Sequence, residues 1–169
     1  MKPDLEPPLP PASESRTWYP HVTVATVVPQ GDRFLFVEES IRGRLVLNQP
    51  AGHLECGETL LAAAVRETIE ETGWDVELEC LLGIQQWTST NSGSHFVRFT
   101  FGARAVRHDA ARPLDTGIVR ALWLRRDEIA DAQARLRSPL VLNSVDDWID
   151  GRRLPLDAIR SLASGTPSL

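Results

Sequence analysis

The chain has few cysteines, no long apolar run and no excess of positive charge. Its two cysteines, Cys56 and Cys80, are too few for a four-ligand zinc site, and no histidine pair completes a familiar zinc spacing. We therefore expect reduced thiols, and we expect Cys56, which lies inside the predicted metal loop, to be a bystander without a catalytic role. The formal net charge of −5 disfavours a broad basic surface, so no nucleic-acid partner is expected.

Apolar segments are too short to cross a bilayer, and the N-terminus lacks the charged-then-apolar layout of a secretory signal. These absences predict a cytoplasmic protein without a membrane partner. The length of 169 residues and the hydrophobic content of 42% suit one domain with a well-formed core. Five of the twelve prolines fall within residues 1–19, which predicts a flexible leader. A domain over residues 20–160 and a flexible tail over residues 161–169 are expected to follow.

Acidic residues gather around one predicted helix over residues 59–72. Helical spacing puts Glu67, Glu70 and Glu71 on one narrow face, where like charges one turn apart cost stability unless a cation compensates them. Thr59 is the expected N-terminal cap, and Gly73 is the expected left-handed residue at the other end. An apolar stripe on the opposite face is expected to dock on a sheet; its members are Leu61, Val65, Thr68, Ile69 and Thr72.

The segment before this helix has unusual backbone freedom. Gly52 and Gly57 relax the backbone there, and the carbonyl of Gly52 can face a metal ion. Glu58 and Arg66 lie eight residues apart, too far for a one-turn helix pair, so they meet only if the loop folds back. Acid runs such as Glu70–Glu71 usually form a solvated face when they stand alone. The two glycines and the Arg-Glu pair favour a metal site instead.

Taken together, Gly52, Glu58, Arg66-Glu67, Glu70-Glu71 and Gly73 resemble the Nudix box of the Nudix hydrolase superfamily. The two aliphatic places of that pattern hold Thr68 and Trp74 here, and we expect Thr68 to pack inward with its hydroxyl bonded to the helix. A narrower resemblance, to the NudJ-type phosphatase subfamily, lies in HVTVA (21–25), NQPAGHLE (48–55) and LRSPLV (136–141). The similarity runs over residues 21–159, most of the chain.

The resemblance implies an α/β (α+β) fold, a Nudix-like α/β/α sandwich. In it, helices enclose a mixed, curved sheet and the box forms a loop-helix-loop. The β-rich segments 21–28 and 33–38 flank the turn signal PQGD and predict a hairpin. Further strands are predicted over residues 44–49, 74–87, 95–107 and 118–124, and helices over residues 126–134 and 140–149.

Clustered carboxylates favour Mg²⁺, with Mn²⁺ as a substitute, because such hard cations bind oxygen ligands and bridge them to substrate phosphates. We expect three box glutamates and the carbonyl of Gly52 to hold the ion, while Glu58 and Arg66 orient the ligands. The expected catalytic set is Glu58, Arg66, Glu67, Glu70 and Glu71, of which the last three are the metal-binding glutamates.

Two alternatives remain for the identity of the general base. Many Nudix enzymes carry an acid in a later loop, shortly before a strand that bears a tryptophan. The matching segment here is RPLDTGIVRALW (112–123), where Gly117 stands at the expected place and Asp115 is the nearest carboxylate. Either Asp115 or a box glutamate takes the role, and an aspartate beside threonine and glycine is also an ordinary turn residue.

Candidate substrate contacts follow from residue type and position. Arg42 and Arg44 can grip terminal phosphates or remain solvated surface charges. Trp87 and Phe96 can stack an aromatic ring or pack in the core. The remaining candidates lie in or near the NudJ-like segments and are Gln49, His53 and Arg98.

The preferred interpretation is Mg²⁺-dependent hydrolysis of a diphosphate linkage in nucleoside di- and triphosphates by an activated water. The NudJ resemblance implies thiamine-related diphosphates as further substrates. The partner is then a small phosphorylated substrate, and the chain is expected to be a monomer or a small homo-oligomer. An alternative is a Nudix-like ligand sensor without turnover, although such modules often lose box acids that this chain keeps. Isopentenyl-diphosphate isomerisation needs a catalytic cysteine in another motif, and neither cysteine lies in such a setting.

Overall fold

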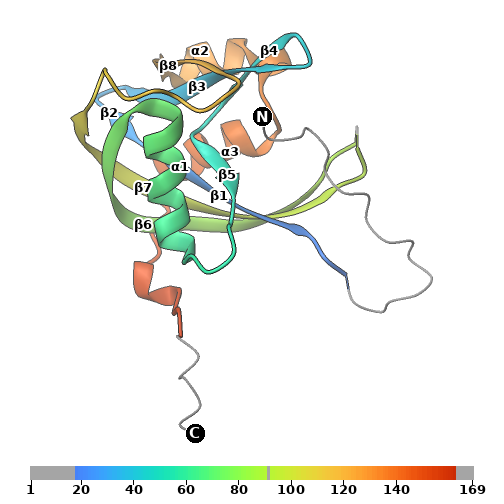
Figure 1. Ribbon diagram of the computed structural model, residues 1–169, viewed down its shortest axis with the longest axis vertical. Coiled ribbons are helices and arrows are strands. Elements are labelled where there is room, and N and C mark those ends of the chain that lie inside the picture. The colour runs from blue at the N-terminus through green and yellow to red at the C-terminus, as the bar shows by residue number, and fades with distance from the viewer. Residues whose placement is uncertain (1–17, 91, 163–169) are drawn as a thin grey trace, which may run out of the picture.

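The fold places two helices on opposite faces of a mixed sheet (Figure 1). The computed structural model describes residues 18–90 and 92–162. The described strands are β1 (His21–Val27), β2 (Pro29–Gln30), β3 (Arg33–Ile41), β4 (Arg44–Asn48), β5 (Ala51–His53), β6 (Trp74–Thr88), β7 (His95–His108) and β8 (Ile118–Arg125). The helices are α1 (Leu60–Thr72), α2 (Arg126–Asp131) and α3 (Leu140–Ile149), with 3₁₀ turns η1 (Gln133–Arg135) and η2 (Leu156–Ala158).

The strands divide over two sheets. The first has the order β5-β1-β7-β6, in which β1 runs parallel to β7 and the other pairs are antiparallel. In the second, β3 pairs antiparallel with β2, β4 and β8. α1 packs against the face of the first sheet that carries Val24 and Phe101, while α3 packs against the face that carries Val27 and Cys80. The expected sandwich of helices around a mixed sheet is confirmed.

The predicted hairpin of residues 21–28 with 33–38 is wrong in its first strand. β1 leaves for the first sheet, and the two-residue strand β2 forms the hairpin with β3 instead. The turn itself lies where PQGD indicated, with Gly31 at φ 63°, a left-handed conformation that glycine adopts without strain. The chain therefore changes sheet between β1 and β2. Strand composition alone does not reveal such a change.

Both predicted ends of the box helix are confirmed. The Thr59 hydroxyl accepts a hydrogen bond from the Ala62 N–H at 3.1 Å, and Gly73 has φ 72° with its N–H donating to the Ile69 carbonyl at 2.9 Å. Thr68 packs inward as expected. Its hydroxyl donates to the Ala64 carbonyl at 2.7 Å and lies 2.8 Å from the hydroxyl of Thr26 on β1.

The predicted buried stripe of α1 is only partly right. The buried positions are Ala63, Ala64, Glu67, Thr68, Glu71 and Thr72, so the stripe contributes only its two threonines. Leu61 and Val65 are partly buried and pack against the core clusters, and together with Ile69 they line an open groove of ≈ 820 Å³ between α1 and the first half of β6. Small alanines and threonines face the sheet because they allow the helix to approach closely, and this rotation carries two glutamates inward.

The remaining elements follow the sequence closely. The strands predicted over 44–49, 74–87, 95–107 and 118–124 are β4, β6, β7 and β8, and the helix predicted over 140–149 is α3. The helix predicted over 126–134 ends early, at Asp131, and continues as the turn η1. None of the described helices is long and apolar enough to cross a membrane. The predicted leader over 1–19 and tail over 161–169 fall almost entirely outside the described residues.

A buried carboxylate connects β3 with β8 and with the turn η1. Glu38 on β3 is 4% exposed and accepts hydrogen bonds from Arg120 on β8, at 2.9 Å, and from Arg135 in η1. The hydrogen bond from Arg120 lowers the pKa of Glu38 below its ordinary value of 4.5; burial opposes this effect and Arg135 adds to it. The ionised carboxylate therefore stabilises the fold.

Replacing Glu38 with glutamine is expected to lower the free energy of unfolding at pH 7 by about 1–2 kcal/mol, because charge-assisted hydrogen bonds are lost. Since the folded-state pKa is lowered, this contribution is present above about pH 4.5 and is lost as the pH falls through the folded pKa. Urea unfolding of wild type and Glu38→Gln over a series of pH values should show the gap between them closing in acid. The exposed Glu79→Gln serves as the control, and a gap independent of pH would contradict this account.

Candidate active site

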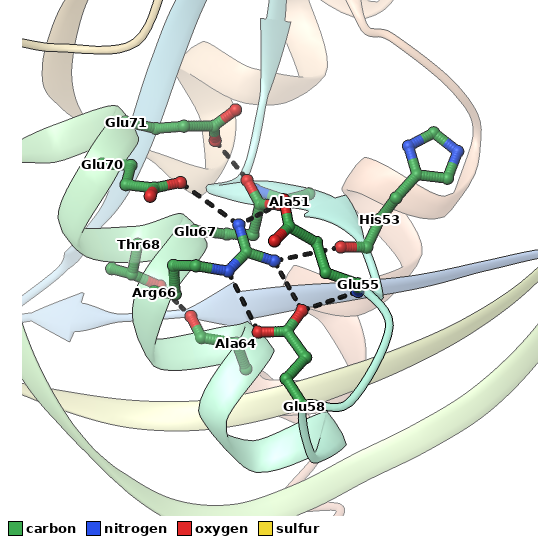
Figure 2. Close-up of polar contacts among 10 residues, drawn as sticks. All are labelled: Ala51, His53, Glu55, Glu58, Ala64, Arg66, Glu67, Thr68, Glu70 and Glu71. Atoms are coloured by element: carbon green, nitrogen blue, oxygen red, sulfur yellow. Dashed lines mark hydrogen bonds and ion pairs between the residues drawn. The ribbon is translucent and has the colours of Figure 1, made fainter. Parts of the chain in front are cut away.

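Arg66 is the centre of the polar network around the box helix (Figure 2). Its Nε and Nη2 donate to the two oxygens of Glu58 at 3.0 and 2.7 Å, so the loop does fold back and the predicted pair forms. Its Nη1 donates to Glu67 Oε1 at 2.8 Å and to Glu70 Oε2 at 3.1 Å, and its Nη2 donates to the His53 carbonyl at 3.1 Å. One guanidinium therefore fixes the approach loop and two box glutamates relative to each other.

A local hydrogen bond within the approach loop also holds Glu58. The N–H of Glu55 donates to Glu58 Oε1 at 2.7 Å. Hydrogen bonding from Arg66 lowers the pKa of Glu58 most strongly; burial opposes this effect, and the Glu55 N–H adds to it. The ion pair in turn raises the pKa of Arg66, so both groups are held in their charged forms.

The glutamates are packed against the backbone of β5. Glu71 Oε2 accepts a hydrogen bond from the Ala51 N–H at 2.9 Å. The carboxylate of Glu67 lies directly over Gly52, where a Cβ atom would overlap with it. Residue 52 is therefore restricted to glycine by contact with a carboxylate, because Gly52 itself is not among the residues with positive φ.

Glu71 stands in a strongly acidic environment. Burial raises its pKa well above the ordinary value of 4.5, although the Ala51 N–H favours the ionised form. The charges of Glu39, Glu67 and Asp115 raise the pKa of Glu71 further. Four carboxylates are thus near one another at the junction of α1, β3, β5 and the loop before β8.

The carboxylates of Glu67, Glu70 and Glu71 do not converge on a common point. Among the described residues, no three His, Cys, Asp or Glu side chains lie close enough together to hold a metal ion. Glu67 and Glu70 are both drawn to Arg66, while Glu71 is bonded to β5. They are not directed into bulk solvent either, since Glu67 and Glu71 are 8% exposed and the Glu70 side chain is 39% exposed.

These residues nevertheless fit a hard dication. The donor set consists of carboxylate oxygens, the ligands that Mg²⁺ and Mn²⁺ prefer. A buried glutamate repelled by three other acids is an arrangement that a nearby cation would stabilise. The space over Gly52 lets the Glu67 carboxylate lie against the β5 backbone, beside the carbonyl expected to face the ion.

The loop before β8 lies against the C-terminal half of the box helix. The Asp115 N–H donates to the Glu70 carbonyl at 2.9 Å, and the Gly117 carbonyl accepts from the Ser40 N–H at 2.8 Å. Gly117 has φ 98°, which a side chain at this position would strain. The structure therefore brings Asp115 into the acidic group around Glu71, while the choice of the general base stays a prediction.

Buried polar residues continue from the carboxylates across the α3 face of the first sheet. Arg98 on β7 is 5% exposed, and its Nη2 donates to Gln49 Oε1 at 2.9 Å. Gln49 is fully buried and donates to the Val141 carbonyl at 2.6 Å. Burial lowers the pKa of Arg98 to about 10, while the charges of Glu71 and Glu39 act in the opposite direction. Arg98 is therefore close enough to Glu71 and Glu39 to feel their charges, while the roles of Arg98 and Gln49 in substrate binding remain predictions.

Glu39 belongs to this acidic region, although the sequence pattern did not predict it. Glu39 ends the buried part of β3, accepts a hydrogen bond from Asn48 Nδ2 at 3.2 Å and adds negative charge near Glu71. Nothing in its neighbourhood along the chain marks it, since Glu38 and Glu39 look like an ordinary acidic pair. Only the register of β3 with β4 and β8 separates a structural Glu38 from a site-facing Glu39.

The other predicted substrate contacts are three ring-bearing residues on the first sheet and two arginines at the β3–β4 turn. Trp87 and Phe96 stack on each other at 5.3 Å between ring centroids, and His53 is the residue after Gly52. Arg42 and Arg44 lie at the exposed turn between β3 and β4. Arg44 pairs with Ile41, two residues along β3 from Glu39, and both arginines are exposed. The roles of all these residues remain predictions.

An acidic helix braced by an arginine, with a glycine-bearing loop on a mixed sheet, defines a Nudix-type phosphohydrolase. The chain belongs to this family: the model of the NUDIX domain matches residues 19–143. It is similar to phosphatase NudJ of Escherichia coli strain K12, with 42% identity over 140 residues, 83% of this chain and 90% of that protein. The protein is therefore a Nudix hydrolase, similar to NudJ phosphatases.

Solved structures agree with this classification. A Nudix hydrolase from Nitrosomonas europaea is 48% identical with a TM-score of 0.84, covering 85% of this chain and 98% of its own. A UDP-X diphosphatase has a TM-score of 0.66 at 16% identity, covering 85% of this chain and 69% of its own, and shows the fold alone. The family acts on small phosphorylated substrates and generally uses a divalent metal.

Proposed function

We propose that this Nudix hydrolase cleaves a diphosphate linkage in nucleoside di- and triphosphates and in thiamine-related diphosphates, with Mg²⁺ as the resident metal. The observation that carries the proposal is the acidic group of Glu39, Glu67, Glu71 and Asp115 beside the Arg66 network. Its negative charge has the same sign as that of a polyphosphate, so a cation has to mediate between the two. The similarity to phosphatase NudJ supports release of phosphate from such substrates.

In this proposal Glu67, Glu70 and Glu71 hold the cation with the carbonyl of Gly52, and Mn²⁺ is a substitute. When bound, the ion supplies positive charge to the phosphate oxygens and an acidified water as nucleophile. The protein positions the ligands. Arg66, held by Glu58 through two hydrogen bonds, sets the orientation of the Glu67 and Glu70 carboxylates.

The proton of the attacking water is taken by Asp115 or by a box glutamate. Asp115 is favoured by its place, because its loop is hydrogen-bonded to the Glu70 carbonyl and its charge acts on Glu71. A box glutamate is favoured by the raised pKa of Glu71, since a base with a higher pKa accepts a proton more readily. Parallel pH-rate profiles of Asp115→Asn and Glu71→Gln distinguish the two: loss of the ascending limb identifies the base.

Hydrolysis is tested by incubating the protein and Mg²⁺ with a panel of nucleotides and thiamine diphosphates while orthophosphate and pyrophosphate are quantified separately. Turnover of at least one of these compounds is expected, together with its loss on adding a chelator and its recovery with excess Mg²⁺. Turnover that is insensitive to chelation would contradict the metal assignment. Tight binding without turnover would favour the ligand-sensing alternative.

Arg66→Lys is expected to lower kcat about tenfold, because an ammonium cannot bind Glu58 through two parallel bonds and still reach Glu67 and Glu70. Steady-state kinetics against Arg104→Lys, an exposed arginine paired with Glu77, measures the effect. Equal kcat values for both variants would mean that the charge of Arg66, and not the geometry of its guanidinium, is what matters.

A further inference from the structure

A buried pair of threonines joins the box helix to the first sheet. Thr26 on β1 and Thr68 on α1 are both fully buried, and their hydroxyl oxygens lie 2.8 Å apart. The Thr68 hydroxyl donates its one hydrogen to the Ala64 carbonyl at 2.7 Å (Figure 2). The Thr26 hydroxyl is therefore the donor between the two threonines, and Thr68 Oγ1 accepts from it. We call Thr26 and Thr68 the threonine pair.

The contact with β1 is additional to the ordinary bonding of a helical threonine. Such a hydroxyl is commonly satisfied by the carbonyl four residues earlier, and Ala64 fills that role for Thr68. The Nudix pattern has an aliphatic residue at this place, so the family does not require a hydroxyl here. Apolar packing is non-directional, whereas a hydrogen bond is directional. The threonine pair therefore fixes the position of α1 along β1 in a way that the neighbouring alanines, Ala63 and Ala64, do not.

Thr26 also holds the segment that leads into β5. Its N–H donates to the Pro50 carbonyl at 3.0 Å, and the residue before it, Ala25, pairs with Ala51. Pro50 is two residues before Gly52, whose carbonyl is expected to face the cation. A single residue of β1 is therefore bonded through its backbone to the approach to Gly52 and through its hydroxyl to the box helix.

On the helix, Thr68 lies between the two buried glutamates. Glu67 is the residue before it, and the Glu67 carboxylate lies over Gly52. Glu71 is three residues after it and accepts from the Ala51 N–H at 2.9 Å. A shift of α1 along its axis by the rise of one residue, about 1.5 Å, would break such a hydrogen bond and move both carboxylates relative to β5. The position of Thr68 on β1 thus determines where both glutamates meet β5.

We infer that the threonine pair positions the metal ligands. Its hydrogen bond fixes α1 along β1 and so holds Glu67 and Glu71 at β5. The inference rests on the proposed function, because it assigns the contact that places the ligands of the proposed metal site. Both hydroxyls act through the glutamates, and not on the cation or the substrate. Losing the hydrogen bond leaves the fold intact but allows the two carboxylates to move.

Equilibrium Mn²⁺ binding, followed by electron paramagnetic resonance, tests the inference in three variants. Thr68→Val keeps the shape of the side chain but leaves the buried Thr26 hydroxyl without an acceptor, so Mn²⁺ is expected to bind about tenfold more weakly. Thr68→Ser keeps the hydroxyl and is expected to bind Mn²⁺ as the wild type does. Adding Thr26→Val to Thr68→Val removes the unpaired donor and should restore most of the lost affinity.

Ser144→Ala is the matched control. Ser144 on α3 is fully buried, donates to the Leu140 carbonyl at 2.8 Å and accepts from Gln85 on β6 at 3.4 Å. It therefore repeats the same helix-to-sheet arrangement on the α3 side of the first sheet. Its loss should lower the thermal unfolding temperature by about 5 °C, as Thr68→Val does, but leave the Mn²⁺ affinity unchanged. A purely structural role of the threonine pair predicts instead that the two variants behave alike.

A measurement without metal separates this inference from the proposed function. Hydrogen exchange of the Ala51 amide, followed by nuclear magnetic resonance, reports whether Glu71 still accepts from it. This amide is expected to exchange at least about tenfold faster in Thr68→Val than in Ser144→Ala. That result, together with a wild type that binds no Mn²⁺, contradicts the proposed metal site and supports the positioning of Glu71.

Three results overturn the inference. The first is that Thr68→Val exchanges the Ala51 amide and binds Mn²⁺ as the wild type does. The second is that Ser144→Ala loses as much as Thr68→Val in both measurements. The third is that neither Thr68→Ser nor the double variant recovers the Mn²⁺ affinity that Thr68→Val has lost.

Discussion

Replacing Glu70 with glutamine is expected to lower kcat at least about a hundredfold while the protein remains folded. The substitution removes a charge from the proposed metal ligands but keeps the size of the side chain. Glu70 is half-exposed, and its carboxylate pairs with Arg66 at 3.1 Å, so little burial or packing is lost. The free energy of unfolding should change by less than about 1 kcal/mol. Phosphate release at saturating Mg²⁺ and substrate measures kcat, and circular dichroism checks the fold.

The matched control for this variant is Glu79→Gln. Glu79 lies on β6, its side chain is 45% exposed and its nearest ion pair, with Arg104, is 3.9 Å long, so it resembles Glu70 in charge, size and exposure but lies away from the box helix. Its kcat should equal that of the wild type. If Glu70→Gln also turns over at the wild-type rate, Glu70 takes no part in holding the cation.

Gly52→Ala is expected to lower kcat/KM about a hundredfold with only a small loss of stability. The new Cβ would overlap with the Glu67 carboxylate, the far end of a flexible side chain, which moves more easily than the backbone. The carboxylate is then displaced from its place over β5, and a ligand misplaced by about 1 Å can lose two orders of magnitude in rate. Kinetics and thermal unfolding measured on the same preparation separate the two effects.

Gly83→Ala provides the comparison for this variant. Gly83 is a strand glycine without positive φ, and a Cβ there meets no atom within 4 Å. Wild-type kinetics are therefore expected. A Gly52→Ala protein that is strongly destabilised, or one that is fully active, would show that the contact with Glu67 does not position a ligand.

The local part of the site was predictable because its residues interact along one short stretch of chain. The Thr59 and Gly73 ends of α1 are fixed by capping chemistry, and Glu58, which directly precedes the cap, reaches Arg66 on the same helix. The same reasoning failed for the buried face of the helix. Helical periodicity predicts that acidic residues face the solvent, whereas Glu67 and Glu71 are buried beside β5.

What the sequence did not reveal depends on contacts between distant strands. Glu39 approaches Glu71 only because β3 pairs with β4 and β8 in one register, and its own neighbourhood carries no signal of this. The wrong first strand of the predicted hairpin has the same cause. β2, and not β1, pairs with β3, and this depends on which sheet each strand joins. Trp87 and Phe96 were recognised as ring-binding candidates, but their separation from the core appears only in the fold.

The central claim is that the box glutamates hold a hard dication. Equilibrium binding of Mn²⁺, followed by electron paramagnetic resonance with Mg²⁺ as competitor, tests it without requiring turnover. The account predicts that wild type binds Mn²⁺, that Mg²⁺ displaces it, and that Glu67→Gln and Glu70→Gln each weaken binding at least about tenfold. Unchanged Mn²⁺ affinity and stoichiometry in both folded variants would contradict it.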